Sequence, residues 1–312
     1  MGFFRKKLIF EKQFIPNLKK AATHLIIALI KAISWLPFPL LYFLSDLLRP
    51  LMYYCIRYRK KVVFVNLRKS FPEKPEEEIR QMAKGFYKHL CDLFFETLKV
   101  GSMNKKSLSL RMRVRGFEKL NDYFTKGRSV VLLATHYGNW EWLAILPVFL
   151  KHKTVPVYKP LQNELFDRYQ KKNREKFGAS AVPMALTLRI VVEAEERSEP
   201  IALGLAADQT PLWNHKFWTL FFHQEAMFFN GPARIAQRYN LPLFFEYTRK
   251  VSRGKYETGF ELLFENPADV DEVTLIKTYV QKLEALIREK PEYYLWSHRR
   301  WKHKRRSGLP LY

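Results

Sequence analysis

The stretch SVVLLATHYGNWEW at residues 129–142 joins a short apolar run to a polar and aromatic turn. The valines and leucines of residues 129–135 are typical of a short strand buried in a sheet. Similar apolar runs follow along the chain, and segments with helical spacing lie between them. Strands that alternate with helices predict an α/β fold in which helices cover both faces of a sheet.

We expect further strands and helices on the same grounds. The predicted strands are residues 154–158, 201–206, 217–222, 241–247 and 256–264. The predicted helices are residues 139–150, 163–177, 187–195, 232–239 and 273–290. Residues 62–100 place apolar side chains three and four positions apart, which predicts helices before the sheet begins. Sites in such folds lie beyond the carboxyl ends of the strands, and residues 135–142 occupy that position.

Composition restricts the class of protein. The 312 residues include 54 Lys and Arg against 30 Asp and Glu, a net charge of +24, and 47% are hydrophobic. A chain this apolar is not disordered, and its charge indicates an anionic partner, either nucleic acid, an acidic protein or an anionic membrane. Two cysteines exclude a disulfide-stabilised secreted domain and favour a reducing compartment.

Residues 21–56 are the most apolar part of the chain, and basic residues flank them on both sides. Pro37 and Pro39 each remove a helix hydrogen bond, so the segment fits either one membrane span or a re-entrant or in-plane hairpin. A buried hydrophobic helix pair is the third possibility. We therefore expect a basic, membrane-anchoring segment at 1–61. The rest of the chain, 62–312, forms a domain with a helical lead-in at 62–111 and a basic C-terminal helix or tail at 291–312.

His136 and Glu141 form the most distinctive candidate site, with four residues between them. A carboxylate that orients an imidazole makes it a general base able to deprotonate a hydroxyl. Gly138 permits a sharp turn, and N–H groups near Gly138 and Asn139 could stabilise an oxyanion at the start of the following helix. The chain carries no recognisable nucleotide-binding, zinc-binding or serine-hydrolase motif, so we expect no metal and no cofactor.

The segment HYGNWEW at 136–142 resembles the His-x4-Glu element of the glycerolipid acyltransferase superfamily. A wider ordered set, covering about residues 20–305, resembles the lipid A late acyltransferase family. The supporting segments are NLRKSFPEKPEEEI at 66–79, VYKPLQNELFDRYQKKNREKFG at 157–178, AADQTP at 206–211, FFHQEAMFFNGPARIAQRYNLPL at 221–243 and PEYYLWSHRRWK at 291–302.

This resemblance implies a central mixed β-sheet flanked by helices, and a reaction. A fatty acyl chain would move from the phosphopantetheine thioester of acyl carrier protein to a hydroxyl of a lipid A precursor, without a covalent enzyme intermediate. His136 would be the base and Glu141 its orienting partner. Arg174 and Asp208 would support the charge and geometry of the site, and binding of a lipid phosphate is an alternative role for Arg174.

The resemblance also implies partners and a location. The expected partners are acyl carrier protein, a lipid A precursor or related glycolipid, and the membrane, with no nucleic acid; the expected place is the bacterial inner membrane, with the catalytic domain facing the cytoplasm. Alternatives are an acyltransferase for another glycolipid or glycerophospholipid, a membrane-associated nucleic-acid-binding protein, and a catalytically silent adaptor. The residues expected to bind an anionic partner are Arg299, Arg300, Lys302, Lys304, Arg305 and Arg306.

Overall fold

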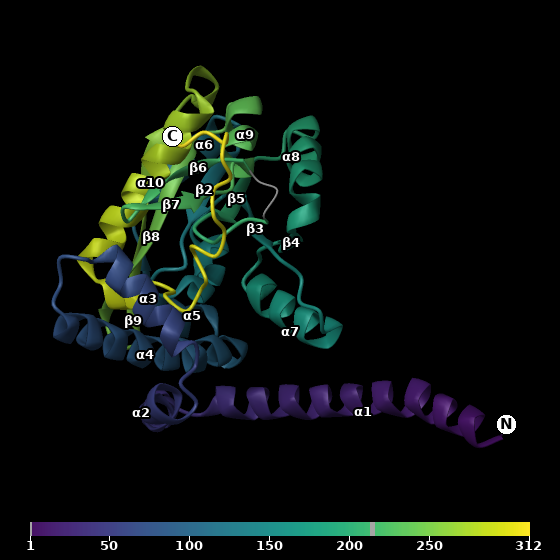
Figure 1. Ribbon diagram of the computed structural model, residues 1–312. Coiled ribbons are helices and arrows are strands. Elements are labelled where there is room, and N and C mark those ends of the chain that lie inside the picture. Colours follow the sequence, from purple (N-terminus) through teal and green to yellow (C-terminus); the bar gives the residue numbers. More distant parts are fainter. Residues whose placement is uncertain (1, 213–215) are drawn as a thin grey trace.

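A seven-stranded sheet forms the centre of the computed structural model, which describes residues 2–212 and 216–312, with only the backbone described for residues 2–18 (Figure 1). Its strand order is β1-β9-β8-β2-β5-β3-β4. β8 and β9 pair antiparallel and the other neighbouring pairs run parallel, so the expected mixed sheet is confirmed. The strands are β1 (Met112–Val114), β2 (Val130–Ala134), β3 (Lys153–Tyr158), β4 (Val182–Pro183), β5 (Ile201–Ala206), β8 (Leu243–Ser252) and β9 (Lys255–Phe264), beside a separate hairpin of β6 (Trp218–Phe221) and β7 (Gln224–Met227).

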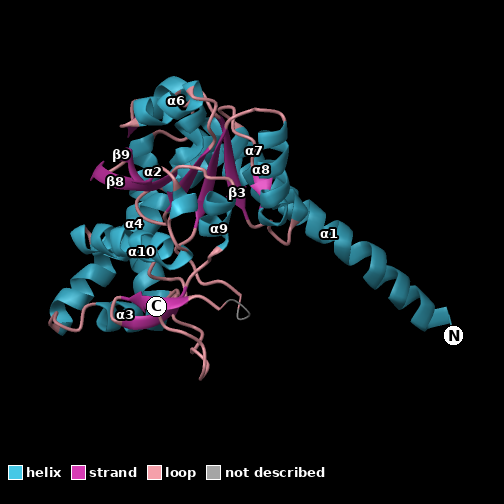
Figure 2. Cartoon of the chain, turned by 90° about the horizontal axis from the view of Figure 1, so that it is seen from above, coloured by secondary structure: helices cyan, strands magenta, loops and turns pink. Residues whose placement is uncertain are grey.

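Strand β2 is buried on both faces because its alternate side chains enter two different hydrophobic clusters. Val131 and Leu133 face one cluster, and Val130 and Leu132 face the other. The α-helices that contribute buried side chains to the first cluster are α3 (Lys60–Ser70), α4 (Glu76–Lys99), α8 (Thr187–Glu196), α9 (Gly231–Arg238) and α10 (Glu272–Glu289). The second contains side chains of α5 (Lys105–Ser109), α6 (Phe117–Thr125) and the 3-10 helix Trp140–Val148. Figure 2 shows helices on both sides of the sheet.

Several predicted elements differ from the observed ones. The helix expected at 139–150 is the 3-10 helix Trp140–Val148, which contains Pro147 and therefore lacks an α-helical hydrogen-bond donor there. Strands β1 and β4 were not predicted, because two or three residues carry too little periodicity to detect, and β7 was missed because Gln224 and Glu225 are not typical strand residues. Helix α7 (Glu164–Glu175) lies within the predicted 163–177.

The C-terminal segment is a tail and not a helix after the short 3-10 turn Pro291–Tyr293. Polar side chains of the N-terminal part of the chain hold its backbone. The Asn66 amide donates to the carbonyls of Trp296 and His298, both at 2.9 Å, and Arg59 donates to Ser297 at 3.0 Å. Trp296 is fully buried, so the tail packs on the core.

The N-terminal segment forms helix α1 (Gly2–Trp35), helix α2 (Phe38–Pro50) and a π-helical turn, Leu51–Cys55. Pro37 lies at the break between α1 and α2, as its missing N–H predicts. Helix α1 extends well beyond the α/β body (Figure 1). Among the residues that the structure describes, no helix combines the length and apolar character needed to cross a membrane.

Candidate active site

His136 and Asp208 come together at the carboxyl edge of the sheet. Strands β2 and β5 are parallel neighbours in which Ala134 pairs with Ala206. His136 lies two residues beyond the end of β2, and Asp208 lies two residues beyond the end of β5. Nδ1 of His136 lies 2.7 Å from Oδ1 of Asp208, and the backbone N–H of His136 donates to Oδ2 at 3.0 Å. Both carboxylate oxygens of Asp208 therefore hold the same residue in place.

The expected partner of the imidazole was Glu141, and this expectation is wrong. The 3-10 helix that replaces the predicted α-helix carries Glu141 toward α7, where Oε1 lies 3.5 Å from Nη2 of Arg174. The Glu141 and Arg174 side chains are 18% and 28% exposed. The pair is close enough to influence the ring, because the Glu141 charge raises and the Arg174 charge lowers the pKa of His136.

Electrostatics leave a basic nitrogen on the side of the ring away from Asp208. Burial lowers the pKa of His136, but the charge and hydrogen bond of Asp208 outweigh it, so the net pKa is raised above its usual value. Burial raises the pKa of Asp208, yet His136 lowers it by more, so Asp208 is ionised at neutral pH. The carboxylate accepts a hydrogen bond from Nδ1–H, which leaves Nε2 unprotonated in the neutral ring. The His136 side chain is 19% exposed, so the ring is partly open to solvent.

Gly138 shapes the turn but offers no free N–H. Its φ is +65°, and a Cβ at this position would overlap the carbonyl of Thr248, so only glycine fits. The Gly138 N–H donates to the carbonyl of Tyr293 at 3.0 Å, because Tyr137 and Tyr294 form a bridge that brings the tail alongside the turn. The expectation that this N–H stabilises an oxyanion is therefore wrong.

The side chain of Asn139 is also committed to the scaffold. It is fully buried, its Nδ2 donates to Glu96 at 2.8 Å, and its Oδ1 accepts from the Trp142 N–H at 3.2 Å. Asn139 thus caps the 3-10 helix and fixes the turn to α4. Gly138 and Asn139 therefore position His136, and neither the Gly138 N–H nor the Asn139 side chain is available to the reacting groups.

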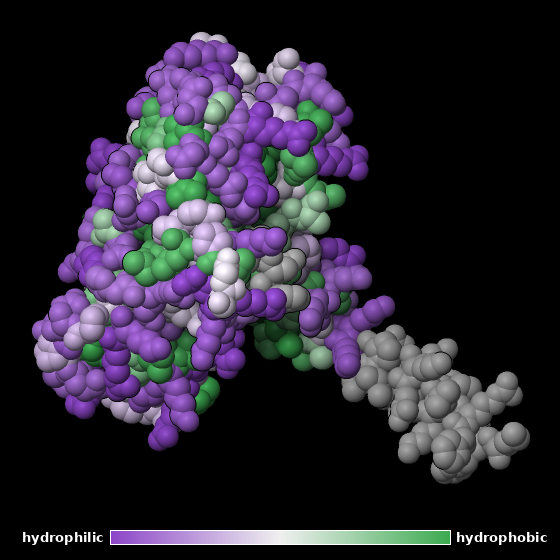
Figure 3. Space-filling model, turned by 45° about the horizontal axis from the view of Figure 1, so that its top comes forward, coloured by the Kyte–Doolittle hydropathy of each residue, from purple (hydrophilic) through white to green (hydrophobic). Residues whose placement is uncertain are grey.

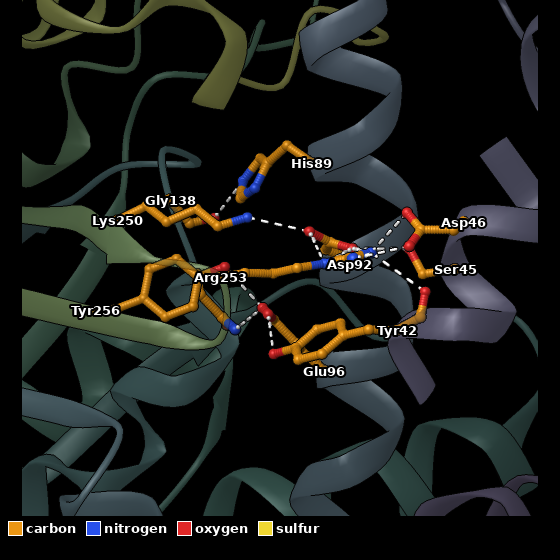
Figure 4. A network of polar contacts seen from close by, with 11 residues as sticks. Tyr42, Ser45, Asp46, His89, Asp92, Glu96, Gly138, Lys250, Arg253 and Tyr256 are labelled. Carbon is orange, nitrogen blue, oxygen red and sulfur yellow. Dashed lines mark hydrogen bonds and ion pairs between the residues drawn. The ribbon is translucent and has the colours of Figure 1, made fainter. Parts of the chain in front are cut away.

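A buried polar network beneath the turn was not predicted from the sequence (Figure 4). Helix α4 supplies His89, Asp92 and Glu96, spaced three and four residues apart on one helical face. Nε2 of His89 lies 3.0 Å from the Gly138 carbonyl, and burial lowers the pKa of His89 to about 3, so this ring is neutral. Neutral His89 therefore connects the turn to α4 through the Gly138 carbonyl.

Asp92 and Glu96 each satisfy several donors in this network. Asp92 accepts from Ser45 of α2 at 2.8 Å, from Arg253 at 2.6 Å and from Lys250 at 3.2 Å. The donors to Glu96 are Tyr42 at 2.9 Å, Asn139 at 2.8 Å and Tyr256 at 2.7 Å. The spacing of acids on an apolar helix face was the only signal for this network in the sequence.

The basic tail divides into buried and exposed residues. Arg300 is 1% exposed and its guanidinium lies 4.0 Å from the ring centroid of Phe228, so the expectation that it binds an anionic partner at the surface is wrong. Its backbone is fixed because the Thr210 hydroxyl donates to the Arg300 carbonyl at 2.6 Å. Arg305 pairs with Glu225 at 2.7 Å. The exposed basic residues are Arg299, Lys302, Lys304 and Arg306, whose expected role stays a prediction.

Among residues 2–212 and 216–312, no group of three or more His, Cys, Asp or Glu side chains is arranged to hold a metal ion.

Gln209 was not predicted as a site residue, but its side-chain nitrogen lies 3.1 Å from Nε2 of His136. Its position directly after Asp208, at the end of a strand that neighbours β2, was the available signal. Trp140 also contacts the imidazole edge-on, with ring centroids 5.1 Å apart.

Known proteins resemble this chain over most of its length. The chain is 26% identical to a lipid A biosynthesis lauroyltransferase of Escherichia coli K12, over 92% of this chain and 93% of that protein. It is 24% identical to a lipid A biosynthesis palmitoleoyltransferase of the same organism, over 86% of each chain. A lipid A biosynthesis acyltransferase of Haemophilus influenzae is 20% identical, over 74% and 72%. Residues 10–303 match the family described as bacterial lipid A biosynthesis acyltransferase, and the chain therefore belongs to that family.

Proposed function

We propose that this protein transfers a fatty acyl chain from the thioester of acyl carrier protein to a hydroxyl of a lipid A precursor. Two relatives are named for the transfer of lauroyl and palmitoleoyl groups in lipid A biosynthesis, which supports the reaction class. The observation that carries the proposal is the His136–Asp208 pair at the sheet edge, which leaves Nε2 as the unprotonated nitrogen of a partly exposed ring.

In this mechanism the hydroxyl oxygen attacks the thioester carbonyl carbon while its proton passes to Nε2 of His136. Ionised Asp208 stabilises the imidazolium that forms. The carbon–sulfur bond then breaks with its electron pair on sulfur, and the proton on Nε2 moves to the leaving thiolate. Arg174, held by Glu141, supplies positive charge near the ring for the oxyanion or for a lipid phosphate.

The test is transfer by the purified protein from acyl carrier protein thioesters of several chain lengths to a lipid A precursor. His136→Ala should lower turnover by about 10²–10⁴-fold, because the proton acceptor is lost. Its thermal unfolding midpoint should stay close to that of the wild type. His223→Asn is a matched control, because His223 is exposed in the turn between β6 and β7. Near-normal transfer by His136→Ala would reject the assignment.

A second acceptor class, another glycolipid or a glycerophospholipid, uses the same chemistry. Lipids from a strain that lacks the protein separate the two. The loss of one acyl chain from lipid A alone supports the lipid A precursor, and a change confined to another lipid class supports the alternative. The deletion strain thus tests the acceptor without assuming the mechanism.

We place the protein on the cytoplasmic face of the bacterial inner membrane, docked through α2 and the π-helical turn after it. A stripe at helical spacing exposes large apolar side chains there: Leu40 40%, Phe43 57%, Leu47 56%, Leu51 45% and Tyr54 59%. Figure 3 shows patches of hydrophobic residues among hydrophilic ones on the face of the body that it presents. Such a stripe fits a helix that lies in the membrane interface. Adjacent Arg57 and Lys61, both exposed, would favour anionic lipid.

Vesicle binding tests this placement. Phe43→Ser with Leu47→Ser should weaken binding to vesicles that contain phosphatidylglycerol, because both side chains leave water for the interface. Turnover with detergent-dispersed acceptor should not change. Leu188→Ser on α8 is the matched control, since Leu188 is 47% exposed on another part of the molecule. Equal vesicle binding by the double variant and the control would contradict the placement.

The exposed basic residues of the tail are proposed to bind the acidic carrier protein. The tail lies against the site, because the Thr210 N–H donates to Nε2 of His298 at 3.0 Å and Thr210 follows Gln209. Lys302→Glu should raise KM for acyl carrier protein thioester, through repulsion at the rim of the interface. It should leave KM for a small acyl thioester unchanged, and an equal effect on both donors would argue against docking.

A further inference from the structure

The reaction needs a hydrogen-bond donor for the oxyanion, and several N–H donors near His136 are already used. The Gly138 N–H donates to Tyr293, the Asn139 amide nitrogen donates to Glu96, and the Thr210 N–H donates to His298. An oxyanion donor must be free and close to the base at the same time. This inference rests on the proposed function and names a further residue in the same site.

Gln209 meets both conditions. Its side-chain nitrogen lies 3.1 Å from Nε2 of His136. Because Asp208 accepts from Nδ1–H, Nε2 carries a lone pair, and the Gln209 nitrogen is the donor in this contact. The amide has two hydrogens. One faces Nε2, and within the described part of the chain no hydrogen bond uses the other.

Chain geometry keeps the amide at this position. Gln209 follows Asp208, whose two carboxylate oxygens are held by the N–H and the ring of His136. On the other side, the Thr210 hydroxyl donates to the Arg300 carbonyl at 2.6 Å. The backbone on both sides of Gln209 is therefore fixed, as preorganised oxyanion stabilisation requires.

We propose that Gln209 is a catalytic residue whose side-chain N–H donates to the thioester carbonyl oxygen as that oxygen becomes negative. The acceptor hydroxyl replaces the amide at Nε2 and gives its proton to that nitrogen. The new carbon–oxygen bond moves the carbonyl electron pair onto oxygen, where the Gln209 N–H meets it. When the carbon–sulfur bond breaks, the carbonyl re-forms and the proton on Nε2 passes to sulfur.

Steady-state kinetics of Gln209→Ala and Gln209→Glu test the proposal. Glutamate keeps the shape but its carboxylate has no N–H to donate. Both variants should lower kcat by about 10²–10³-fold, with KM for either substrate changed only a few-fold. Gln281→Ala, an exposed position on α10, is the matched control. If kcat of both Gln209 variants stays within threefold of wild type, the proposal is overturned.

A pH profile separates this role from a structural one. The Gln209 N–H stabilises the unprotonated ring, so its removal should move the acid limb of kcat/KM to higher pH. Histidine NMR titration of the substrate-free protein should show the same shift for His136, and an unmoved titration overturns the contact. If the wild type and both Gln209 variants transfer the acyl chain but His136→Ala does not, only the role of Gln209 is rejected. Absence of transfer by the wild type rejects the proposed function instead.

Discussion

Asp208 and Asp92 are two buried carboxylates with different surroundings. They are 1% and 0% exposed. Asp92 receives hydrogen bonds from Ser45, Lys250 and Arg253, two of them cations. In the described structure the Asp208 carboxylate hydrogen-bonds to one other residue, His136, through the backbone N–H and the ring of that residue. A carboxylate neutralised by fixed cations serves the scaffold, whereas one that faces a titratable ring with a second, accessible nitrogen can take part in proton transfer.

The largest expected effect is that of Asp208→Asn. The amide cannot hold the Nδ1–H tautomer as the carboxylate does, so Nε2 loses its lone pair in part of the population, and imidazolium loses its counter-charge. We expect turnover to fall by about 10⁴-fold, as for the aspartate of a serine-hydrolase triad. Transfer assays measure it. If Asp208→Asn keeps a tenth of wild-type turnover, Asp208 does not take part in proton transfer and its role is structural, like that of Asp92.

Asp92→Asn should act on stability and not on chemistry. It leaves Lys250, whose side chain is 9% exposed, without its counter-charge, whereas Arg253 keeps its ion pair with Asp46. Removing one partner of a buried ion pair costs about 3–5 kcal/mol. Urea unfolding measures the cost. The folded protein should keep turnover within about tenfold, because Glu96 and His89 still hold the turn. A loss of turnover as large as in Asp208→Asn would contradict the distinction.

The two acids also differ in how far the sequence alone predicts them. The runs at 129–135 and 201–206 predict strands, and parallel strands end at the same sheet edge, so residues just beyond them are expected to meet. Asp92 hydrogen-bonds to Ser45, Lys250 and Arg253, which are separated from it by 47, 158 and 161 positions in the sequence. Local sequence patterns do not encode contacts over such separations. The spacing of His136 and Glu141 predicted a contact that the 3-10 geometry removed.

Arg300 shows the same limit in the tail. A run of basic and aromatic residues is typical of a solvated surface, and for Arg299 and Lys302 the structure agrees. The carbonyl of Arg300 instead accepts from Thr210, and its side chain packs on Phe228. Burial of one residue within a charged run depends on tertiary contacts, so composition could not identify it.

Glu246 extends the comparison to an acid that no cation neutralises among its hydrogen-bond partners in the described structure. Its Oε1 accepts from the hydroxyls of Thr248 and Thr258, both at 2.7 Å, while Oε2 has no partner there. Burial raises the pKa of Glu246 from 4.5 to about 7. The folded state therefore binds the Glu246 proton more tightly than the unfolded state does. The protonated carboxyl stabilises the folded protein fully below pH 4.5, and this contribution to the free energy of unfolding is lost as the pH rises through 7.

Glu246→Gln should remove that pH dependence, because glutamine keeps the neutral shape at every pH. The raised pKa corresponds to about 3 kcal/mol at most, so the variant should be more stable than wild type at pH 8 by up to that amount. At pH 4 the two should be nearly equal. Urea unfolding at both pH values measures this, and a parallel loss of stability in both proteins would assign the pH dependence to other groups.

The smallest expected effect comes from an exposed pair with geometry similar to that of Asp92 and Arg253. Arg68 donates to both carboxylate oxygens of Glu76 at 2.8 and 2.7 Å, yet the side chains are 52% and 43% exposed. Water and salt screen such pairs, and ordering two long side chains costs entropy. Arg68→Ala should leave the urea midpoint without a resolvable change. A loss comparable to that of Asp92→Asn would mean that ion-pair distance, and not burial, determines which carboxylates support this fold.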